Sequence, residues 1–434
     1  MLAPSAIRRR LSSVGPAGLG GRARWAMVVE LLQLASSVLV FLILANLLPT
    51  EDYGVLGGVL GVAATAASLC NVGSHVLLIK RAAQGHDLAD AWRRATSVGI
   101  LGPLAGTLLL IGLRPLILPD VDPWIYAMLV ASQLNFFWLT ELAVYIGNGT
   151  RRLKESAQLR LIVVCCRFLA LLAFAVFGDG RLGAWAFASL VSFGAAAGLC
   201  LLYVWRVFGL RPSVFAVSTS DLVEGAPFAA YASTESLVDV SDRPLLVRYG
   251  HETDAGIYSL GGRIIQFGYL PLRILMRASD ADIFEAGREG TRRALAVTRS
   301  LMVPGVVVGI AVGAGVLVCA PIVPLLVGDK YAEAVDTMRL LAVMPLIRAV
   351  QYLMGNCLSA SNHQMSRVWA TVAAAALNFG LNLRLLPTGS WRTAVFTTIV
   401  SEVFLAGVLL LVVYGWAWRE RNGEAGHEGW QELV

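Results

Sequence analysis

Charged side chains are scarce in this sequence. Only 15% of its 434 residues are Asp, Glu, Lys or Arg, whereas 57% are hydrophobic. Soluble domains average about 25% charged and about 45–50% apolar residues, so an ordinary water-soluble enzyme is excluded. The hydrophobic residues come in runs of about 20, the length of a helix that crosses about 30 Å of hydrocarbon. The sequence therefore predicts an all-α polytopic membrane protein.

The motifs of common enzymes are also missing. The sequence contains neither G-x-x-x-x-G-K-[ST], which binds the phosphates of ATP, nor the G-x-S-x-G nucleophile elbow. Its six cysteines and five histidines show no metal-ligand spacing. Two D-x-D strings, 120–122 and 280–282, are short enough to arise by chance, and the outer loops are too short to shield a reaction from water. We expect a protein that is not an enzyme and holds no metal.

Hydropathy predicts about twelve transmembrane helices, using windows of about 19 residues. The spans lie near residues 25–48, 55–79, 96–118, 124–147, 159–178, 183–205, 225–249, 256–278, 300–319, 337–357, 369–386 and 392–416. They predict a first six-helix bundle at 25–205 and a second at 225–416. The remaining segments are a basic tail at 1–24, a linker at 206–224 and a second tail at 417–434, all three cytoplasmic.

The basic residues predict the orientation. The two tails and the loops on their side hold 23 of the 35 Lys and Arg residues, whereas the opposite loops hold six. Because cytoplasmic loops carry an excess of Lys and Arg, both termini are expected in the cytoplasm, in a multi-pass protein of the inner membrane. The net charge of +6 is explained by this topology and by contact with anionic membrane lipids, so no nucleic acid partner is expected.

Two short sequence echoes indicate an internal duplication. The segment 50–56 (TEDYGVL) follows the first span and resembles 252–258 (ETDAGIY) after the seventh, at an offset of 202 residues. A Gly-Asn pair ends the fourth span at Gly147-Asn148 and the tenth at Gly355-Asn356, at an offset of 208. Since six spans return the chain to the same side, the two copies are expected to be parallel, related by a pseudo-two-fold axis along the membrane normal, with substrate binding between them near the midplane.

Ionisable residues occur inside several spans, where they are costly and usually face a cavity or one another. On the eighth span, at 100° per residue, Arg263, Gln266, Arg273 and Arg277 fall within an arc of about 80°. On the seventh, Asp239, Asp242 and Arg243 share one side with Glu235. Glu30 on the first span and Arg348 on the tenth add to these groups.

Two interpretations of these polar residues remain open at this point. They could pair between packed helices and only hold the bundle together, at about 0.6 kcal/mol for each hydrogen bond. Alternatively, they could line a water-filled cavity. We favour the cavity for the arginines, because each guanidinium brings five donors and a permanent charge, more than three nearby carboxylates could satisfy.

The chain resembles the bacterial oligosaccharide flippase family, the O-antigen and exopolysaccharide translocases, within the multidrug and oligosaccharidyl-lipid exporter superfamily. The residues that carry the resemblance are LANLLPTEDYG at 44–54, DAGIYSL at 254–260, GDKY at 328–331 and NFGLN at 378–382. The likeness extends over nearly the whole chain, from about residue 25 to 416. It implies two MATE-like six-helix bundles that alternate between inward-open and outward-open states.

The resemblance also implies the cargo, a polyprenyl-pyrophosphate-linked oligosaccharide carried to the outer leaflet for surface polysaccharide biosynthesis. Planar guanidiniums could replace the hydration of its diphosphate with bidentate hydrogen bonds. We therefore expect Arg263, Arg273, Arg243 and Arg348 to bind the diphosphate. The cavity would also hold Gln266 and the carboxylates of Glu30, Asp239 and Asp242, and these carboxylates would balance charge or accept a coupling H⁺ or Na⁺. No other cofactor is expected, and polysaccharide polymerase and export machinery are the expected protein partners.

Two other functions fit the same sequence. A cation-coupled exporter of drugs or metabolites with this fold would use Glu30 or Asp239 as its ion site, although an excess of cavity arginines would repel cationic drugs. A membrane glycan polymerase or a scaffold without transport activity is the third interpretation.

Overall fold

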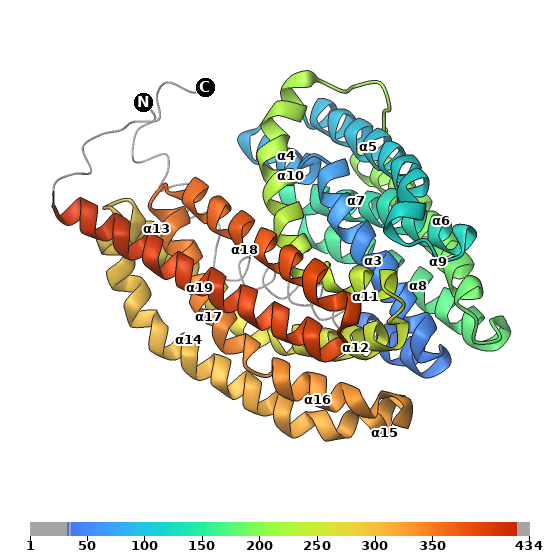
Figure 1. Cartoon of the computed structure of the whole chain (residues 1–434). Coiled ribbons are helices and arrows are strands. Elements are labelled where there is room, and N and C mark those ends of the chain that lie inside the picture. The colour runs from blue at the N-terminus through green and yellow to red at the C-terminus, as the bar shows by residue number, and fades with distance from the viewer. Residues whose placement is uncertain (1–32, 34–35, 151, 423–434) are drawn as a thin grey trace. The chain divides into compact units, whose positions relative to one another are not determined.

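The computed structural model describes residue 33 and residues 36–150 and 152–422. Every regular element in this described part is helical (Figure 1), which confirms the all-α prediction. Contacts divide the chain into two units. The first unit contains the described residues up to 48 and residues 62–233, and the second contains residues 49–61 and 234–422. Each unit is described by itself below.

The first unit contains most of the helices predicted for residues 25–205, together with the start of α10. They are the helix Ser36–Leu47, the later part of α3 (Thr50–Cys70), α4 (Ser74–Gln84), α5 (Leu88–Ile117), α6 (Pro123–Ala131), the π-helix η1 (Ser132–Phe137), α7 (Trp138–Gly149), α8 (Leu153–Phe177), α9 (Leu182–Phe208) and the early part of α10 (Thr219–Val240). Trp92, Val163, Phe193 and Cys200 belong to its core. The carboxylate of Glu141 on α7 accepts two hydrogen bonds from the guanidinium of Arg160 on α8, and both residues are buried.

The second unit begins with the early part of α3 and the end of α10. Its further α-helices are α11 (Asp242–Arg248), α12 (Glu252–Gly268), α13 (Leu270–Gly287), α14 (Thr291–Cys319), α15 (Val323–Val327), α16 (Ala332–Leu341), α17 (Met344–Ala360), α18 (Gln364–Leu385) and α19 (Trp391–Arg421). Helix α17 packs against α13, α14 and α19, and α18 packs against α19 (Figure 1). The buried side chains of Met354, Leu358, Ala374 and Leu409 form part of the core.

Eight helices in the described part are long and apolar enough to span a membrane, and the pair Asp329–Leu341 and Met344–Ala360, bent by 43°, makes a ninth. The first predicted span lies partly outside the described residues. The seventh and eighth are the pairs α10–α11 and α12–α13, which carry the charged residues that the sequence singled out. The chain is thus a multi-pass membrane protein. Each of the twelve predicted spans corresponds to one helix or to consecutive helices, and for the first span this holds for the part that the structure describes.

In the described part of the chain, four predicted spans are interrupted rather than continuous, and the tenth is one of them, broken between the bent pair α16 and α17. The second breaks at 71–73, where Val72 and Gly73 adopt positive φ angles of 43° and 63°. The seventh breaks at Ser241 and the eighth at Tyr269, each just before a proline, Pro244 and Pro271. A proline has no N–H and its ring clashes with the preceding turn, which explains both interruptions. The predicted arc of Arg263, Gln266, Arg273 and Arg277 therefore spans a break between two helices.

The two copies of the first echo contact each other in the second unit. A Cβ added at Gly54 would overlap the carbonyl oxygen of Glu252, and one added at Gly256 would overlap the carbonyl oxygen of Thr50. Thr253 Oγ1 also donates to Glu51 Oε1 at 3.0 Å, although the two residues are 202 positions apart. The contact is reciprocal, as between surfaces related by a two-fold axis. Glycine at both positions lets the backbones of α3 and α12 touch.

The second echo marks equivalent turns in the two units. In the first unit, Asn148 Oδ1 accepts a hydrogen bond from Ser156 at 2.9 Å, and a Cβ at Gly147 would overlap the same serine. In the second unit, a Cβ at Gly355 would lie 3.0 Å from Nε of Arg367. In each case the Gly-Asn pair packs against the start of the next long helix, α8 or α18.

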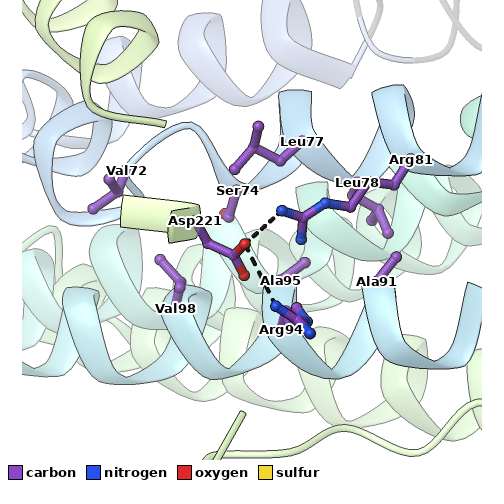
Figure 2. Close-up of a pocket in the computed structure, with 10 residues that line it drawn as sticks. All are labelled: Val72, Ser74, Leu77, Leu78, Arg81, Ala91, Arg94, Ala95, Val98 and Asp221. Carbon is purple, nitrogen blue, oxygen red and sulfur yellow. Dashed lines mark hydrogen bonds and ion pairs between the residues drawn. The ribbon is translucent and has the colours of Figure 1, made fainter. Parts of the chain in front are cut away.

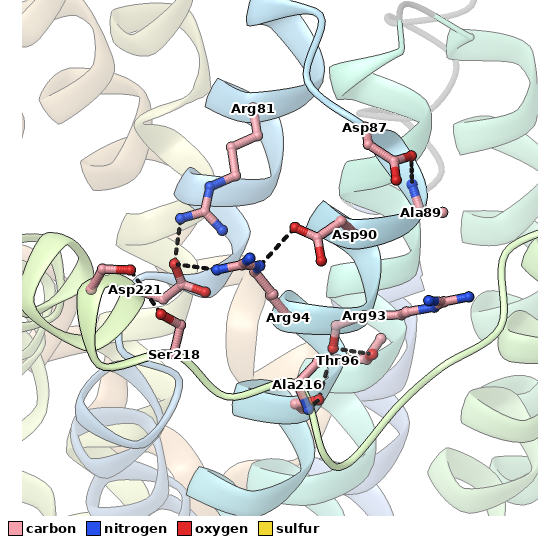
Figure 3. Close-up of polar contacts among 12 residues, drawn as sticks. Arg81, Asp87, Ala89, Asp90, Arg93, Arg94, Thr96, Ala216, Ser218 and Asp221 are labelled. Carbon is pink, nitrogen blue, oxygen red and sulfur yellow. Dashed lines mark hydrogen bonds and ion pairs between the residues drawn. The ribbon is translucent and has the colours of Figure 1, made fainter.

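The segment between α9 and α10 is fixed to α5 by hydrogen bonds. Ser97 Oγ donates to the carbonyl of Ser213 at 2.9 Å and accepts from the amide of Ala216 at 3.0 Å. Thr96 Oγ1 accepts from the amide of Ser213 at 3.0 Å. Figure 3 shows this segment crossing α5 beside the ion pairs that hold the start of α10. These bonds from the side chains of Ser97 and Thr96 to the linker backbone keep the linker in place, although Phe215 is 95% exposed.

An ion-pair cluster attaches the first turn of α10 to α4 and α5. Asp221, which is 3% exposed, accepts a hydrogen bond of 2.5 Å from Arg81 and lies 3.8 Å from a guanidinium nitrogen of Arg94. The three side chains line a cavity of about 10 Å³ (Figure 2), about enough for one water molecule. Lys80 donates to Glu224 in the adjoining exposed pair, at 2.6 Å, and this hydrogen bond lowers the pKa of the Glu224 carboxyl.

The α3–α12 contact predicts that Gly54→Ala destabilises the protein. The added methyl group would overlap backbone atoms, which cannot move aside as a flexible side chain would. Overpacking of this kind costs about 1–3 kcal/mol, so we expect a lower melting temperature of the purified protein in detergent. Gly380→Ala on α18 is the control, because a Cβ there has no neighbour within 4 Å. Equal melting temperatures for the two variants would contradict the close backbone contact.

The buried ion pair predicts that Asp221→Asn loosens the linker. Removing one partner of a buried pair costs about 3–5 kcal/mol, whereas the exposed Lys80–Glu224 pair should contribute at most about 1 kcal/mol. We expect limited chymotrypsin digestion to cut after Phe215 faster in Asp221→Asn than in the wild type, and at the wild-type rate in Glu224→Gln. If the two variants are cut equally fast, burial of Asp221 does not hold the linker.

Candidate functional site

Polar side chains gather inside the second unit, on helices that are otherwise apolar. They come from the end of α10, from α11 and α12, and from the middle of α17, α18 and α19. Burying so many polar groups is tolerable only if they pair, line water or bind a ligand. Three groups can be separated by their partners.

The first group is centred on Arg348 of α17. Its guanidinium donates hydrogen bonds to the carboxylates of Asp239 on α10 and Glu402 on α19. The Glu402 side chain is 0% exposed, whereas that of Asp239 is 34% exposed. Gln351, one turn along α17, donates to Glu402 Oε2 at 2.6 Å and to the Glu402 carbonyl at 2.8 Å. Arg348 is thus a guanidinium shared between a sealed and an accessible carboxylate.

The second group is a chain of amides and hydroxyls. Asn378 Oδ1 on α18 accepts from Ser241 and from Asn382, each at 3.0 Å, and Asn378 Nδ2 donates to Ser401 at 2.9 Å. Thr397 in turn donates to Asn382 Oδ1 at 2.5 Å. All five side chains are buried. Because each one finds a partner inside the protein, this group stabilises the packing of α18 on α19.

Asp242 is satisfied by neighbouring donors and is fully buried. Thr398 Oγ1 donates to its Oδ2 at 3.0 Å, and the amide of Arg243 donates to its Oδ1 at 3.0 Å. Tyr258 on α12 shares a hydrogen bond of 2.9 Å with Thr398. The carboxylate thus anchors the first turn of α11 to α12 and α19.

The third group is cationic. Arg243, 7% exposed, and the partly buried Arg263 lie within electrostatic range of each other and of Tyr53. A Cβ at Gly262 would lie 3.3 Å from Nη2 of Arg243, which places that guanidinium against α12. Asp242 lies within electrostatic range of Arg243, but among the described residues neither arginine forms an ion pair with a carboxylate, and Nε of Arg243 is buried without a hydrogen-bond partner. Two like charges thus lie close together in a protein interior.

Gln266 and Arg273 lie on the two sides of the α12–α13 break, and both are exposed. Arg273 donates to the backbone carbonyl of Gln266 at 3.1 Å, and the same carbonyl accepts from the amide of Tyr269 at 3.3 Å. Of the other predicted site residues, the structure brings Arg348 and Asp239 together and places Asp242 beside Arg243. Glu30 lies outside the described residues.

Sequence reasoning missed the carboxylate that is most deeply buried. Glu402 is the single charged residue in the predicted span 392–416 apart from Arg392 at its end. A search for several polar residues on one helix face cannot find a residue that stands alone. Its presence in an apolar run was the available signal. Tyr53 and Tyr258 were also missed as members of the site. Within the described ranges, no group of three or more His, Cys, Asp and Glu residues could hold a metal ion.

Comparison with known proteins identifies the family. The family model described as polysaccharide biosynthesis protein matches residues 23–270, more than half of the chain. No match is found among curated proteins.

Solved structures share the fold. The chain is similar to a multidrug resistance MATE family transporter of the MOP superfamily in its inward-facing conformation, with 15% identity over 92% of this chain and 96% of that one and a TM-score of 0.64. An outward-facing MATE structure is 14% identical over 92% of this chain and 94% of that one, with a TM-score of 0.58. A MOP superfamily transporter from Pyrococcus furiosus, described by the reverse polarity of its binding pocket, is 13% identical over 91% of this chain and 94% of that one. Its TM-score is 0.62. The chain shares the fold of these transporters and belongs to the polysaccharide biosynthesis protein family.

Proposed function

We propose that this protein is an alternating-access flippase that moves polyprenyl-pyrophosphate-linked oligosaccharide from the cytoplasmic to the outer leaflet of the inner membrane. The observation that carries the proposal is the pair Arg243 and Arg263, two guanidiniums near each other without an ion-pair partner among the described residues. Such a pair is costly unless an anion joins it. A diphosphate supplies several negative oxygens in the geometry that guanidiniums bind best.

Membership of the polysaccharide biosynthesis family supports a glycan cargo, and the MATE-like fold supports transport rather than catalysis. The lipid tail of the cargo would stay in the bilayer while the diphosphate passes along the arginines. We further propose cytoplasmic termini, from the distribution of Lys and Arg, and coupling to H⁺ or Na⁺ through Glu30, Asp239 or Asp242. Membrane lipids, a polysaccharide polymerase and export machinery are the proposed partners, and nucleic acid is not among them.

The second candidate is a cation-coupled exporter of drugs or metabolites. It is favoured by the fold shared with multidrug transporters and by the carboxylates Asp239 and Glu402, with Glu235 in electrostatic range of both. Arg348, however, already neutralises one of these charges. Accumulation of lipid-linked glycan precursor in a deletion strain would support the flippase, whereas altered drug sensitivity without such accumulation would support the exporter.

The diphosphate role predicts that Arg263→Ala and Arg273→Ala strongly reduce glycan export without preventing membrane insertion. Losing a charge-assisted hydrogen bond costs about 1.5–3 kcal/mol, equivalent to about 10–150-fold in the translocation rate. Arg263→Lys keeps the charge but not the bidentate geometry and should retain part of the activity. Translocation of a short-chain lipid-diphosphate sugar in proteoliposomes measures the effect.

The control for this experiment is Arg339→Ala on α16, which removes an exposed guanidinium paired with Asp336 and should leave translocation unchanged. If the Ala and Lys variants of Arg263 both export at the wild-type rate, this arginine does not bind the diphosphate.

A further inference from the structure

The two carboxylates on Arg348 differ in how firmly they are held. Glu402 is fully buried and accepts three hydrogen bonds on its side chain and carbonyl, two of them from Gln351. Asp239 has a side chain 34% exposed, and Arg348 is its one hydrogen-bond partner among the described residues. Glu402 is therefore held firmly against Arg348, whereas separating Asp239 from Arg348 requires much less free energy.

The position of Asp239 in the chain also favours exchange. It lies two residues before the α10–α11 break at Ser241, where the backbone is not held by continuous helical hydrogen bonds. Glu235 is one turn earlier on α10 and within electrostatic range of Asp239. Like charges at this spacing repel each other, so Glu235 weakens the hold of Arg348 on Asp239.

A phosphate oxygen has the same preference for guanidinium donors as a carboxylate oxygen. We propose that Asp239 is a placeholder that occupies, on Arg348, the position that a phosphate oxygen of the transported diphosphate takes. Glu402, fixed by Gln351, is the positioning residue that keeps the guanidinium in place while its other partner is exchanged. This inference rests on the proposed flippase function and assigns Arg348 to the substrate only when Asp239 has moved away.

The placeholder predicts a gain of affinity, which structural damage would not produce. We expect the full-length Asp239→Asn protein in detergent to bind inorganic pyrophosphate about tenfold more tightly than the wild type, as measured by calorimetry. The reason is that the Asp239 carboxylate, which competes with pyrophosphate for Arg348 through about one charge-assisted hydrogen bond, is removed. Glu402→Gln should bind it about tenfold more weakly. Asp336→Asn on α16, which removes an exposed carboxylate paired with Arg339, is the matched control and should bind as the wild type does.

Unchanged or weaker binding by Asp239→Asn at an unchanged melting temperature would overturn the placeholder role. If Arg263→Ala still loses binding in that case, the flippase proposal stands alone. If no variant and no wild-type protein binds pyrophosphate or a short-chain prenyl diphosphate, both proposals fail. Competition experiments distinguish the diphosphate from ordinary lipid phosphate. If phosphatidylglycerol displaces bound pyrophosphate as well as a short-chain prenyl diphosphate does, the assignment to a diphosphate is overturned. Weaker displacement by phosphatidylglycerol would support it.

Discussion

The cost of holding charge inside a membrane protein governs the structure of the second unit. An isolated ion in a medium of low polarity is penalised by several kcal/mol even after relaxation, so each buried charge needs a partner or access to water. Arg348 meets this requirement with two carboxylates and Asp242 with hydroxyl and amide donors. Arg243 lies within electrostatic range of Asp242 but forms no ion pair with it, and Arg263 forms none with any described residue, which makes these two arginines the point where an external anion is most useful.

The interrupted helices and the charges are linked. Asp239, Asp242 and Arg243 stand next to the break at Ser241, and Arg273 follows the break at Tyr269, whereas Arg348 and Glu402 lie within α17 and α19. Backbone groups at the breaks bind side chains nearby: the Arg243 amide binds Asp242, and the Gln266 carbonyl accepts from Arg273 in addition to the Tyr269 amide. Prolines therefore do more here than bend helices, because they create polar backbone sites beside the arginines.

Hydropathy predicted the helical architecture because each span is a local property of about 20 residues. The sequence echoes at 50–56 and 252–258 also proved informative, since the two copies touch through Gly54 and Gly256. Hydropathy could not place the helix breaks, because an averaging window is longer than a break. Partners such as Glu402 for Arg348 were missed because 54 residues separate them, and only the packing of α17 on α19 brings them together.

Comparing the buried ion pairs of the two units shows why a carboxylate beside an arginine is not evidence of function by itself. Glu141 and Arg160 in the first unit have side chains 10% and 9% exposed and form a bidentate pair, closed on both sides. Neither residue can reach a ligand without unpacking α7 from α8. Asp239 and Arg348 use the same two chemical groups, but one side of their pair is open and its carboxylate lies beside a helix break. The difference in function thus follows from accessibility and backbone freedom, and residue type alone could not have distinguished the two pairs.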